Sequence, residues 1–340
     1  MSPANDSAAT TQKSCTPAQP QRGILADNSP PPQPGFFPGR VTLELTNRCN
    51  LHCSFCPRRL MEKARGFMDT DLAKRLLREM ADHAPVTVVP FFRGESLLHP
   101  DWFEILKYAQ DLHVGEIQFT SNASLLTPPV VERLLDLDLP FISFSLDTVD
   151  PDLYNGSRCG ADFETTRANV LHFLKRKQER AVRTQVQASA VGTPAHAPGM
   201  QNFVDYWLPR VNRVRVYVEH SGDGKPGSIG SGLPEFSRRL PCHKPCTDMV
   251  VYWNGEVALC NHDWTRLADG ESLGDVSRDG IAQVWRSPAY EAIRTAHAAG
   301  TVNGITPCQG CDHWKMYHMD GGFLGQIYVN EQQSLGTVRA

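Results

Sequence analysis

Short apolar segments alternate with segments of helical periodicity from residue 41 to residue 219, and no other feature restricts the fold as strongly. In one helical segment Leu72, Leu76 and Met80 recur at helical spacing, behind Asp69 or Thr70 as the N-cap. Strands separated by helices form parallel βαβ units, whose sheet is doubly wound or curled into a full or partial barrel. Expected strands span 41–45, 86–92, 116–120, 141–146, 184–191 and 214–219, and the other expected helices span 102–112, 128–137, 163–177 and 200–208.

Changes in composition divide the chain into four parts. Residues 1–36 are rich in Ser, Thr, Ala, Gln and Pro and lack apolar periodicity, so we expect a disordered tail. The α/β unit covers 37–222, a linker rich in Gly, Ser and Pro covers 223–235, and a second unit covers 236–340.

The second unit holds five of the ten cysteines and little apolar material. Its expected strands, 249–253 and 256–259, flank Asn254-Gly255, a dipeptide that favours a type I′ hairpin. A helix is expected over 281–298. A unit with so small a core is typically stabilised by a metal.

Charge and hydropathy exclude several classes of protein. The 34 Lys and Arg against 37 Asp and Glu give a net charge of −3, and this balance gives no reason to expect nucleic acid as a partner. No segment approaches the ~18–20 consecutive apolar residues that span a membrane, and the N-terminus lacks a secretory pattern. We therefore expect a cytoplasmic protein, in which ten cysteines indicate metal binding or catalysis rather than disulfides.

Three cysteines follow the first expected strand within eight residues: Cys49, Cys53 and Cys56. Soft thiolates select iron-sulfur clusters or zinc, and a zinc site would want a fourth ligand nearby. Three ligands leave one iron of a four-iron cluster open, which is what a reactive cluster needs. The alternative is a cysteine-rich loop without a ligand.

This spacing, on the loop after the first strand, resembles the signature of the radical S-adenosylmethionine (radical SAM) superfamily. The resemblance implies a partial (β/α)6 TIM-type barrel and a [4Fe-4S] cluster whose open iron is chelated by S-adenosylmethionine. It also implies production of a 5′-deoxyadenosyl radical and places Phe55 beside the adenine.

Other segments match the same superfamily in part. Gly94 and Glu95 resemble its Gly-Gly-Glu-Pro segment, which holds the methionine amino group, although Arg93 and Ser96 depart from that pattern. By the same resemblance Asn122, Ser145 and Arg158 are candidate cofactor contacts, with Ser145 for the ribose and Arg158 for the methionine carboxylate. Alternatively, these residues bind no cofactor and are a solvated loop acid, a strand-end hydroxyl and a surface arginine.

The remaining cysteines of the second unit resemble the SPASM/twitch auxiliary-cluster module. The resemblance assigns Cys242, Cys260, Cys308 and Cys311 to one auxiliary [4Fe-4S] cluster. A structural zinc in the same thiolates is the alternative. Cys246 is left over, and it could replace Cys242, be an inert buried thiol, or donate a hydrogen atom to a substrate radical.

One auxiliary cluster after a barrel of this length resembles the enzymes that oxidise or epimerise aminocyclitols and sugars in antibiotic pathways. We therefore predict a dehydrogenase that turns an alcohol of an aminocyclitol or amino sugar into a ketone, served by a flavodoxin- or ferredoxin-type electron donor. Candidate general bases are Glu219, His262 and Asp263, with His220 next to the first of them.

Three alternatives remain open. An epimerase would use Cys246 as the hydrogen-atom donor, and a maturase would modify a peptide instead of a small molecule. A zinc or iron-sulfur structural protein would cleave no S-adenosylmethionine.

Overall fold

The computed structural model describes residues 32–61, 64–229, 232–264, 272–319 and 325–331. The expected tail 1–36 lies outside the described residues except for 32–36, and positions 230 and 231 of the expected linker lie outside them too.

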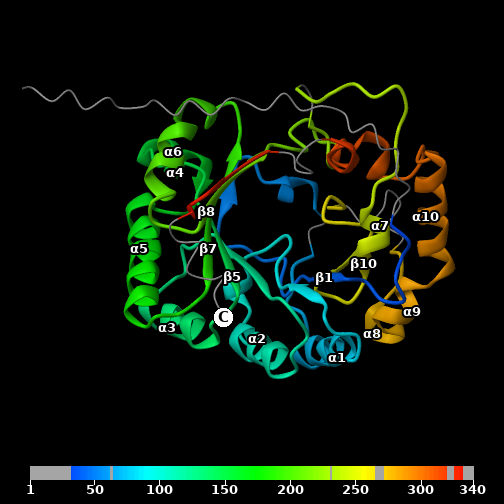
Figure 1. Cartoon of the computed structure of the whole chain (residues 1–340), viewed down its shortest axis with the longest axis horizontal. Helices are drawn as coiled ribbons and strands as arrows, with labels where there is room; N and C mark the ends of the chain where they lie inside the picture. The colour runs from blue at the N-terminus through cyan, green and yellow to red at the C-terminus, as the bar shows by residue number, and fades with distance from the viewer. Residues whose placement is uncertain (1–31, 62–63, 230–231, 265–271, 320–324, 332–340) are drawn as a thin grey trace, which may run out of the picture.

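A curved sheet of parallel strands forms the centre of the fold (Figure 1). Parallel pairs join β1 to β3, β4 to β5, β5 to β7 and β7 to β8, and an isolated parallel bridge between Val88 and Ile117 connects the two groups. The expected partial barrel of the α/β class is confirmed. Its strands are β1 (Arg40–Leu43), β3 (Thr87–Val89), β4 (Gln118–Ser121), β5 (Phe141–Ser145), β7 (Gln185–Gly192) and β8 (Arg213–Val218).

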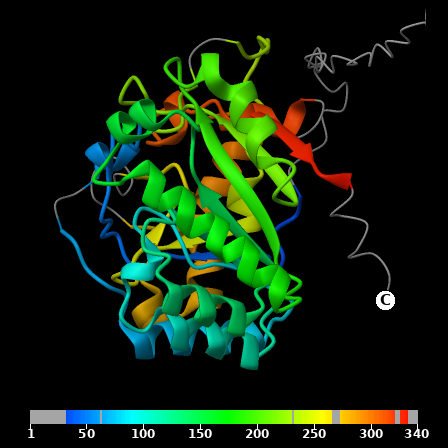
Figure 2. The same cartoon turned by 90° about the vertical axis from the view of Figure 1, so that its left-hand side faces the viewer.

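Helices lie on the outer side of this sheet, and Figure 2 shows the green ones from the side of α5 and α6. Asp69 caps α1 as expected, since its Oδ1 accepts from the Leu72 amide at 2.9 Å. The face of α1 that carries Leu72, Leu76 and Met80 is buried in the core. The outer helices are α1 (Thr70–Ala81), α2 (Trp102–Asp111), α3 (Pro128–Leu137), α4 (Pro151–Ser157), α5 (Phe163–Glu179) and α6 (Met200–Trp207).

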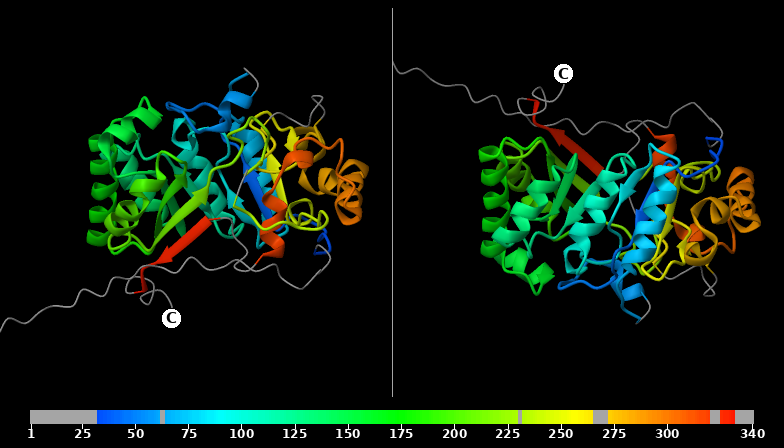
Figure 3. Two further views of the ribbon diagram at one scale, coloured as in Figure 1. Left: turned by 90° about the horizontal axis from the view of Figure 1, so that it is seen from above. Right: turned by 90° about the horizontal axis from the view of Figure 1, so that it is seen from below.

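Strands from the last third of the chain cover both edges of the partial barrel. The hairpin of β9 (Asp248–Val251) and β10 (Val257–Ala258) joins the first edge, where β9 runs parallel to β1 and Met249 lies opposite Val41. At the other edge β11 (Gly325–Val329) pairs antiparallel with β8, and Figure 3 shows it in red away from the orange helices. The two units expected from the sequence therefore share one sheet, and neither edge of the barrel is left unpaired.

Two expectations for the second unit are wrong in detail. The helix expected over 281–298 is broken into α9 (Ile281–Trp285) and α10 (Pro288–Ala299), because Pro288 starts a new helix whose N-cap is Ser287. The hairpin turn is not type I′, which needs a positive φ at both central residues. Only Gly255 has one, at 90°, and its amide donates to the Tyr252 carbonyl at 2.9 Å.

The remaining elements are short, and several carry site residues. No helix among the described residues is both long and apolar enough to cross a membrane. The short elements are β2 (His52–Cys53), β6 (Arg158–Cys159), α7 (Lys244–Thr247), α8 (Val276–Asp279) and the 3-10 helices Pro57–Leu60, Ser96–Leu98, Ala197–Gly199, Cys308–Gly310 and His313–His318.

Candidate active site and auxiliary metal centre

The three cysteines after β1 lie on one tight loop. The Cys56 amide donates to the Cys53 carbonyl at 3.1 Å, and the Leu51 amide donates to Cys49 Sγ at 3.5 Å. Burial raises the pKa of each thiol, that of Cys53 to about 12. Buried thiolates need positive charge beside them, and the iron of a cluster supplies it, so this loop fits the group that its spacing implies.

Arg158 is held against this loop by two interactions. β2 and β6 pair antiparallel with Cys53 opposite Arg158, and the Arg158 side chain forms a buried ion pair with Asp147 at 2.6 Å. Its guanidinium lies 5.8 Å from the centre of the Phe55 ring. Asp147, two residues after β5, adopts a φ of 63° and also accepts from the Val191 amide at 2.8 Å. Two predicted cofactor contacts, Phe55 and Arg158, are therefore neighbours beside the cysteine loop.

Gly94 occupies a position where no side chain fits. A Cβ there would lie 2.2 Å from the Thr46 carbonyl oxygen and 2.4 Å from that of Arg48, so the backbone after β3 lies directly against the segment that leads to Cys49. The fully buried Glu95 follows. Its carboxylate accepts from Ser121 Oγ at 3.0 Å and from the Asn122 amide at 2.7 Å, which joins the ends of β3 and β4.

The Glu95 carboxylate has room for a ligand ammonium group. A carboxylate offers about four lone-pair sites, and the described residues donate three hydrogen bonds to Glu95, the third from the Leu97 amide at 3.3 Å. Burial raises its pKa. A bound ammonium would favour the charged form, so the geometry is compatible with the role predicted for Glu95.

The two other predicted cofactor contacts lie at the ends of neighbouring strands. Asn122 follows β4, and its Nδ2 lies 3.9 Å from Cys49 Sγ and donates to Asn50 Oδ1 at 3.0 Å. Ser145 ends β5 and faces Ser189 of β7, with 3.5 Å between their hydroxyl oxygens. Asn122 thus touches the cysteine loop, whereas the contact seen for Ser145 is to the next strand.

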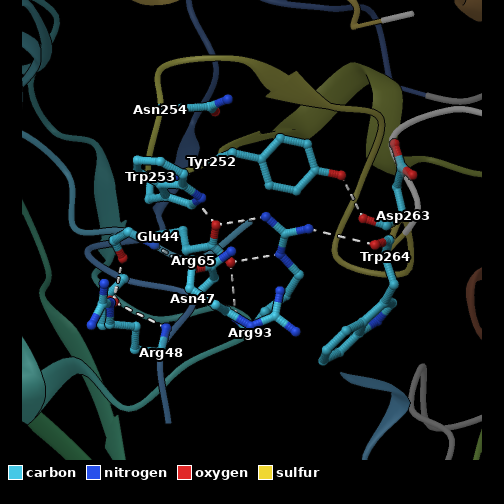
Figure 4. Close-up of polar contacts among 12 residues, drawn as sticks. Glu44, Asn47, Arg48, Arg65, Arg93, Tyr252, Trp253, Asn254, Asp263 and Trp264 are labelled. Atoms are coloured by element: carbon cyan, nitrogen blue, oxygen red, sulfur yellow. Dashed lines mark hydrogen bonds and ion pairs between the residues drawn. The ribbon is translucent and has the colours of Figure 1, made fainter. Parts of the chain in front are cut away.

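The arginine that departs from the superfamily pattern has a structural partner. Figure 4 shows Arg93 forming two hydrogen bonds with the fully buried Glu44, at 2.6 and 2.7 Å. Its guanidinium lies over the Tyr252 ring at 3.9 Å and donates to the Trp264 carbonyl at 3.5 Å. Glu44 also accepts from the Trp253 amide at 3.2 Å. Arg93 therefore ties the Gly94-Glu95 segment to the hairpin of the second unit.

The four cysteines predicted to hold an auxiliary cluster converge on one cavity. Leu259, Met316 and Tyr317 give its lining an apolar part. Burial raises the pKa of all four thiols, and neighbouring cysteine thiols raise the pKa of Cys260, Cys308 and Cys311 further. His297 is among the lining residues, with Nε2 3.3 Å from Cys308 Sγ and Nδ1 3.4 Å from the Cys242 amide that donates to it. The cavity is lined by four thiols: Cys242, Cys260, Cys308 and Cys311.

Cys246 does not line that cavity. It is buried on α7, and the charged groups that act on its thiol are Arg294 and Glu291 of α10. Arg294 Nε donates to the neighbouring Pro245 carbonyl at 3.0 Å. The Cys246 side chain therefore lies toward α10 rather than among the four cavity thiols.

The three predicted bases have different surroundings. Asp263 is fully buried, its Oδ2 accepts from the Leu259 amide at 3.0 Å, and its carbonyl accepts from the Tyr252 hydroxyl at 2.7 Å. Glu219 is partly buried just after β8. His262 is buried in contact with His220 and His313. The structure gathers Glu219 and His262 near the end of β8 and uses Asp263 to hold the loop after Cys260.

Comparison with known proteins agrees with this architecture. A partial parallel barrel with a three-thiol loop after β1, followed by a four-thiol site, defines an iron-sulfur protein with two metal centres. Residues 43–187 match the radical SAM superfamily, and residues 242–312 match the SPASM iron-sulfur cluster-binding domain. The protein is therefore a radical SAM enzyme with a SPASM domain, and its cofactors are S-adenosylmethionine and two [4Fe-4S] clusters.

Curated relatives match the chain over different lengths. The tungsten-containing aldehyde ferredoxin oxidoreductase cofactor-modifying protein of Pyrococcus furiosus is 29% identical over 323 residues, which are 82% of this chain and 90% of that protein. The probable GTP 3′,8-cyclase of Methanococcus maripaludis is 28% identical over 129 residues, 38% of this chain and 43% of its own length. The chain thus spans less than half of some relatives that it matches.

Solved structures share the fold at low sequence identity. BtrN in complex with AdoMet and 2-DOIA superposes with a TM-score of 0.56 at 16% identity and covers 81% of this chain and 92% of BtrN. Streptococcus suis SuiB bound to its precursor peptide SuiA gives 0.64 at 17% identity, over 88% of this chain and 76% of SuiB.

Sequence reasoning missed four functional neighbours. Asp147 orients Arg158, Glu44 holds Arg93, and His297 contacts Cys308. His313 joins His220 and His262. One signal was available, because His262 and His313 each follow a predicted cluster cysteine by two residues in a Cys-x-His segment. The other pairings join residues 11 positions apart (Asp147 with Arg158, His297 with Cys308) or 49 positions apart (Glu44 with Arg93), and none follows a motif that the sequence analysis used.

Proposed function

We propose that this radical SAM enzyme is a dehydrogenase that oxidises a secondary alcohol of an aminocyclitol or amino sugar to a ketone. One observation carries the proposal: His220, directly after β8, contacts His262 and His313, which belong to the two loops that carry Cys260 and Cys311. The four-thiol site thus adjoins the carboxyl end of the barrel, where substrates of such barrels react. This placement supports a cluster that would accept an electron from the substrate.

The chain's own residues have separate parts in this reaction. Cys49, Cys53 and Cys56 would hold one cluster, and Glu95, with Arg158 set by Asp147, would orient the cofactor's methionine end. When bound, S-adenosylmethionine and that cluster supply a radical that removes a hydrogen atom from the hydroxyl-bearing carbon.

The substrate must then lose one proton and one electron to become a ketone. A cluster held by Cys242, Cys260, Cys308 and Cys311 would supply the acceptor for that electron, so that loss of one hydrogen atom, one proton and one electron would make a two-electron oxidation. Glu219 and His262 are the predicted bases nearest the end of β8. Asp263 is less suited to this role, because its buried carboxylate accepts from the Leu259 amide. A ferredoxin- or flavodoxin-type protein in the cytoplasm would supply the reducing electron.

The experiment uses anaerobic protein with both clusters loaded, dithionite, S-adenosylmethionine and 2-DOIA, the compound in the BtrN structure, together with related aminocyclitols. We expect 5′-deoxyadenosine and a product two mass units lighter in equal amounts. The matched control is Cys260→Ala, which should release 5′-deoxyadenosine without ketone. Turnover to a product of unchanged mass would overturn the dehydrogenase.

A second candidate is modification of a peptide, favoured by the superposition on SuiB with its precursor peptide. About a quarter of SuiB has no counterpart in that superposition, whereas nearly all of BtrN has one. A peptide substrate predicts 5′-deoxyadenosine formation only when a precursor peptide is supplied. Epimerisation through Cys246 remains the third prediction, and one solvent deuterium in an isomeric product would establish it.

A further inference from the structure

Three histidines from separate segments meet beside the auxiliary thiols. His220 follows β8, His262 lies in the loop after β10, and His313 starts the 3-10 helix His313–His318. One ring nitrogen of each lies within 4.8 Å of the other two. The rings of His262 and His313 are 3.7 Å apart and nearly parallel, and that of His220 is edge-on to both, at 4.8 and 5.2 Å.

Two of these imidazoles present buried nitrogens without a protein partner. His262 Nδ1 and His313 Nε2 are both shielded from solvent and accept or donate no hydrogen bond among the described residues. His262 is only 5% exposed. Buried polar atoms are normally paired, so two such atoms in one cluster point to a missing ligand. In His220, Nδ1 lies 2.9 Å from Ser221 Oγ, and this contact leaves Nε2 available for a ligand.

The chemistry of the donors points to a metal ion rather than to an anion or a hydrophobic group. All three donors are imidazole nitrogens, which suit zinc and other late divalent metals. Three atoms 4.8 Å apart lie at most about 2.8 Å from a common centre, roughly 0.7 Å beyond a zinc-nitrogen bond, and a small ring rotation closes that gap. Lys244 is a positive charge that acts on both His262 and His313, and it is paired with Asp248 at 2.6 Å.

We propose that His220, His262 and His313 form a mononuclear site for a divalent transition metal such as Zn²⁺, which adjoins the four-thiol site because His262 and His313 also line its cavity. His262 and His313 each follow a cavity cysteine by two residues, so the ion would fasten both cysteine loops to the end of β8. Three protein ligands leave a fourth position open, as in catalytic zinc sites.

An ion in this place has a chemical consequence for the barrel mouth. An oxygen ligand in the open position, from water or from a substrate hydroxyl, becomes more acidic. His262 would then be a ligand and could not also serve as the general base predicted for it. The metal site itself does not depend on which substrate the enzyme uses.

The direct test uses the protein with both clusters loaded first, so that the seven predicted cluster cysteines cannot take the probe ion. One equivalent of Zn²⁺ is added anaerobically, unbound metal is removed, and zinc, iron and sulfide are counted per chain. We expect about one zinc and about eight irons. Zinc-edge X-ray absorption should show nitrogen or oxygen neighbours at ~2.0–2.1 Å. Sulfur neighbours at ~2.3 Å, or no retained zinc, would overturn the proposal.

Variants give the second arm of the test. His220→Ala and His313→Ala should each lower zinc affinity at least ~10-fold while iron stays near eight, since neither residue is a predicted cluster ligand. His172→Ala, on the outer helix α5, is the matched control and should retain zinc. Equal zinc in all variants would overturn the site. If His313→Ala fails to fold, the zinc content of His220→Ala and the zinc–ligand distances measured by X-ray absorption on the unaltered protein still test the proposed site.

Discussion

The two thiol sites are built in opposite ways. The three cysteines after β1 lie within eight residues on one loop, whereas the four auxiliary cysteines span 70 residues, from the start of α7 through the β10 loop to the turn after α10. The first site therefore needs only its loop to fold, and the second forms only when several segments come together. Damage to the first should abolish chemistry with the fold intact, and damage near the second should also loosen the structure.

The largest effect is expected at the local site. Cys53→Ala removes one of the three predicted cluster ligands, so bound iron should fall from about eight to about four per chain, and reductive cleavage of S-adenosylmethionine should drop to background. Iron analysis and chromatography of 5′-deoxyadenosine measure both. Cys159→Ala, an exposed thiol nearby, is the control. Cleavage at the normal rate in Cys53→Ala would remove this loop from the active site.

Cys260→Ala should separate the two reactions, so that S-adenosylmethionine is still cleaved but the substrate alcohol is not oxidised. Iron should again fall from about eight to about four, yet cleavage of S-adenosylmethionine should persist because the loop of Cys49 is untouched. Product ketone should be lost with the electron acceptor. Thermal unfolding should also begin earlier than in Cys53→Ala, since Cys260 helps join distant segments. Equal stability of the two variants would contradict the contrast drawn between the sites.

The stability of the junction between the α/β unit and the second unit should depend on the Glu44 carboxylate. Glu44→Gln leaves Arg93 buried without its countercharge, and losing one partner of a buried pair costs about 3–5 kcal/mol. The exposed pair of Lys107 and Asp111 is the matched control, and Asp111→Asn should cost at most about 1 kcal/mol. Urea unfolding of the holoprotein compares them, and similar midpoints would show that Arg93 does not anchor the hairpin.

A smaller effect is expected from His297. Burial lowers the pKa of its imidazole to about 4, so the ring is neutral, and because Nδ1 accepts from the Cys242 amide, Nε2 carries the proton toward Cys308 Sγ. Hydrogen bonds to cluster sulfur raise the potential. His297→Phe should lower the auxiliary potential by about 40 mV, the equivalent of about 1 kcal/mol. A redox titration followed by EPR measures the shift, and the other cluster is the internal reference.

The sequence predicted the barrel well because its determinants are local. The helix expected over 128–137 is α3, and the expected strand 141–146 differs from β5 by one residue, since alternating apolar patterns and turn residues mark both. Pro288 was overlooked, and it divided an expected helix. The pairing of β9 with β1 joins residues about 200 positions apart, and Arg93 bonds to Glu44 and Trp264, 49 and 171 positions away, which no periodicity records.

The functional sites, like the fold, could be predicted only where their determinants are local in the sequence. The cysteine spacing and Gly94 were readable, because a tight loop and a close backbone approach demand particular residues at fixed offsets. The three-histidine cluster was only half visible, since His262 stood out beside Cys260 while His313 gained its meaning from contact with the end of β8.

The pairing of β9 with β1 also sets a condition on biosynthesis. Met249 lies opposite Val41, so the ribosome adds roughly 200 residues after the first strand before its neighbour exists. At about 5–20 residues per second this takes about 10–40 s, during which β1 emerges with one side unpaired. The nascent chain must shield that strand, or a chaperone must. A barrel expressed without its last third would keep the exposed edge permanently and should aggregate.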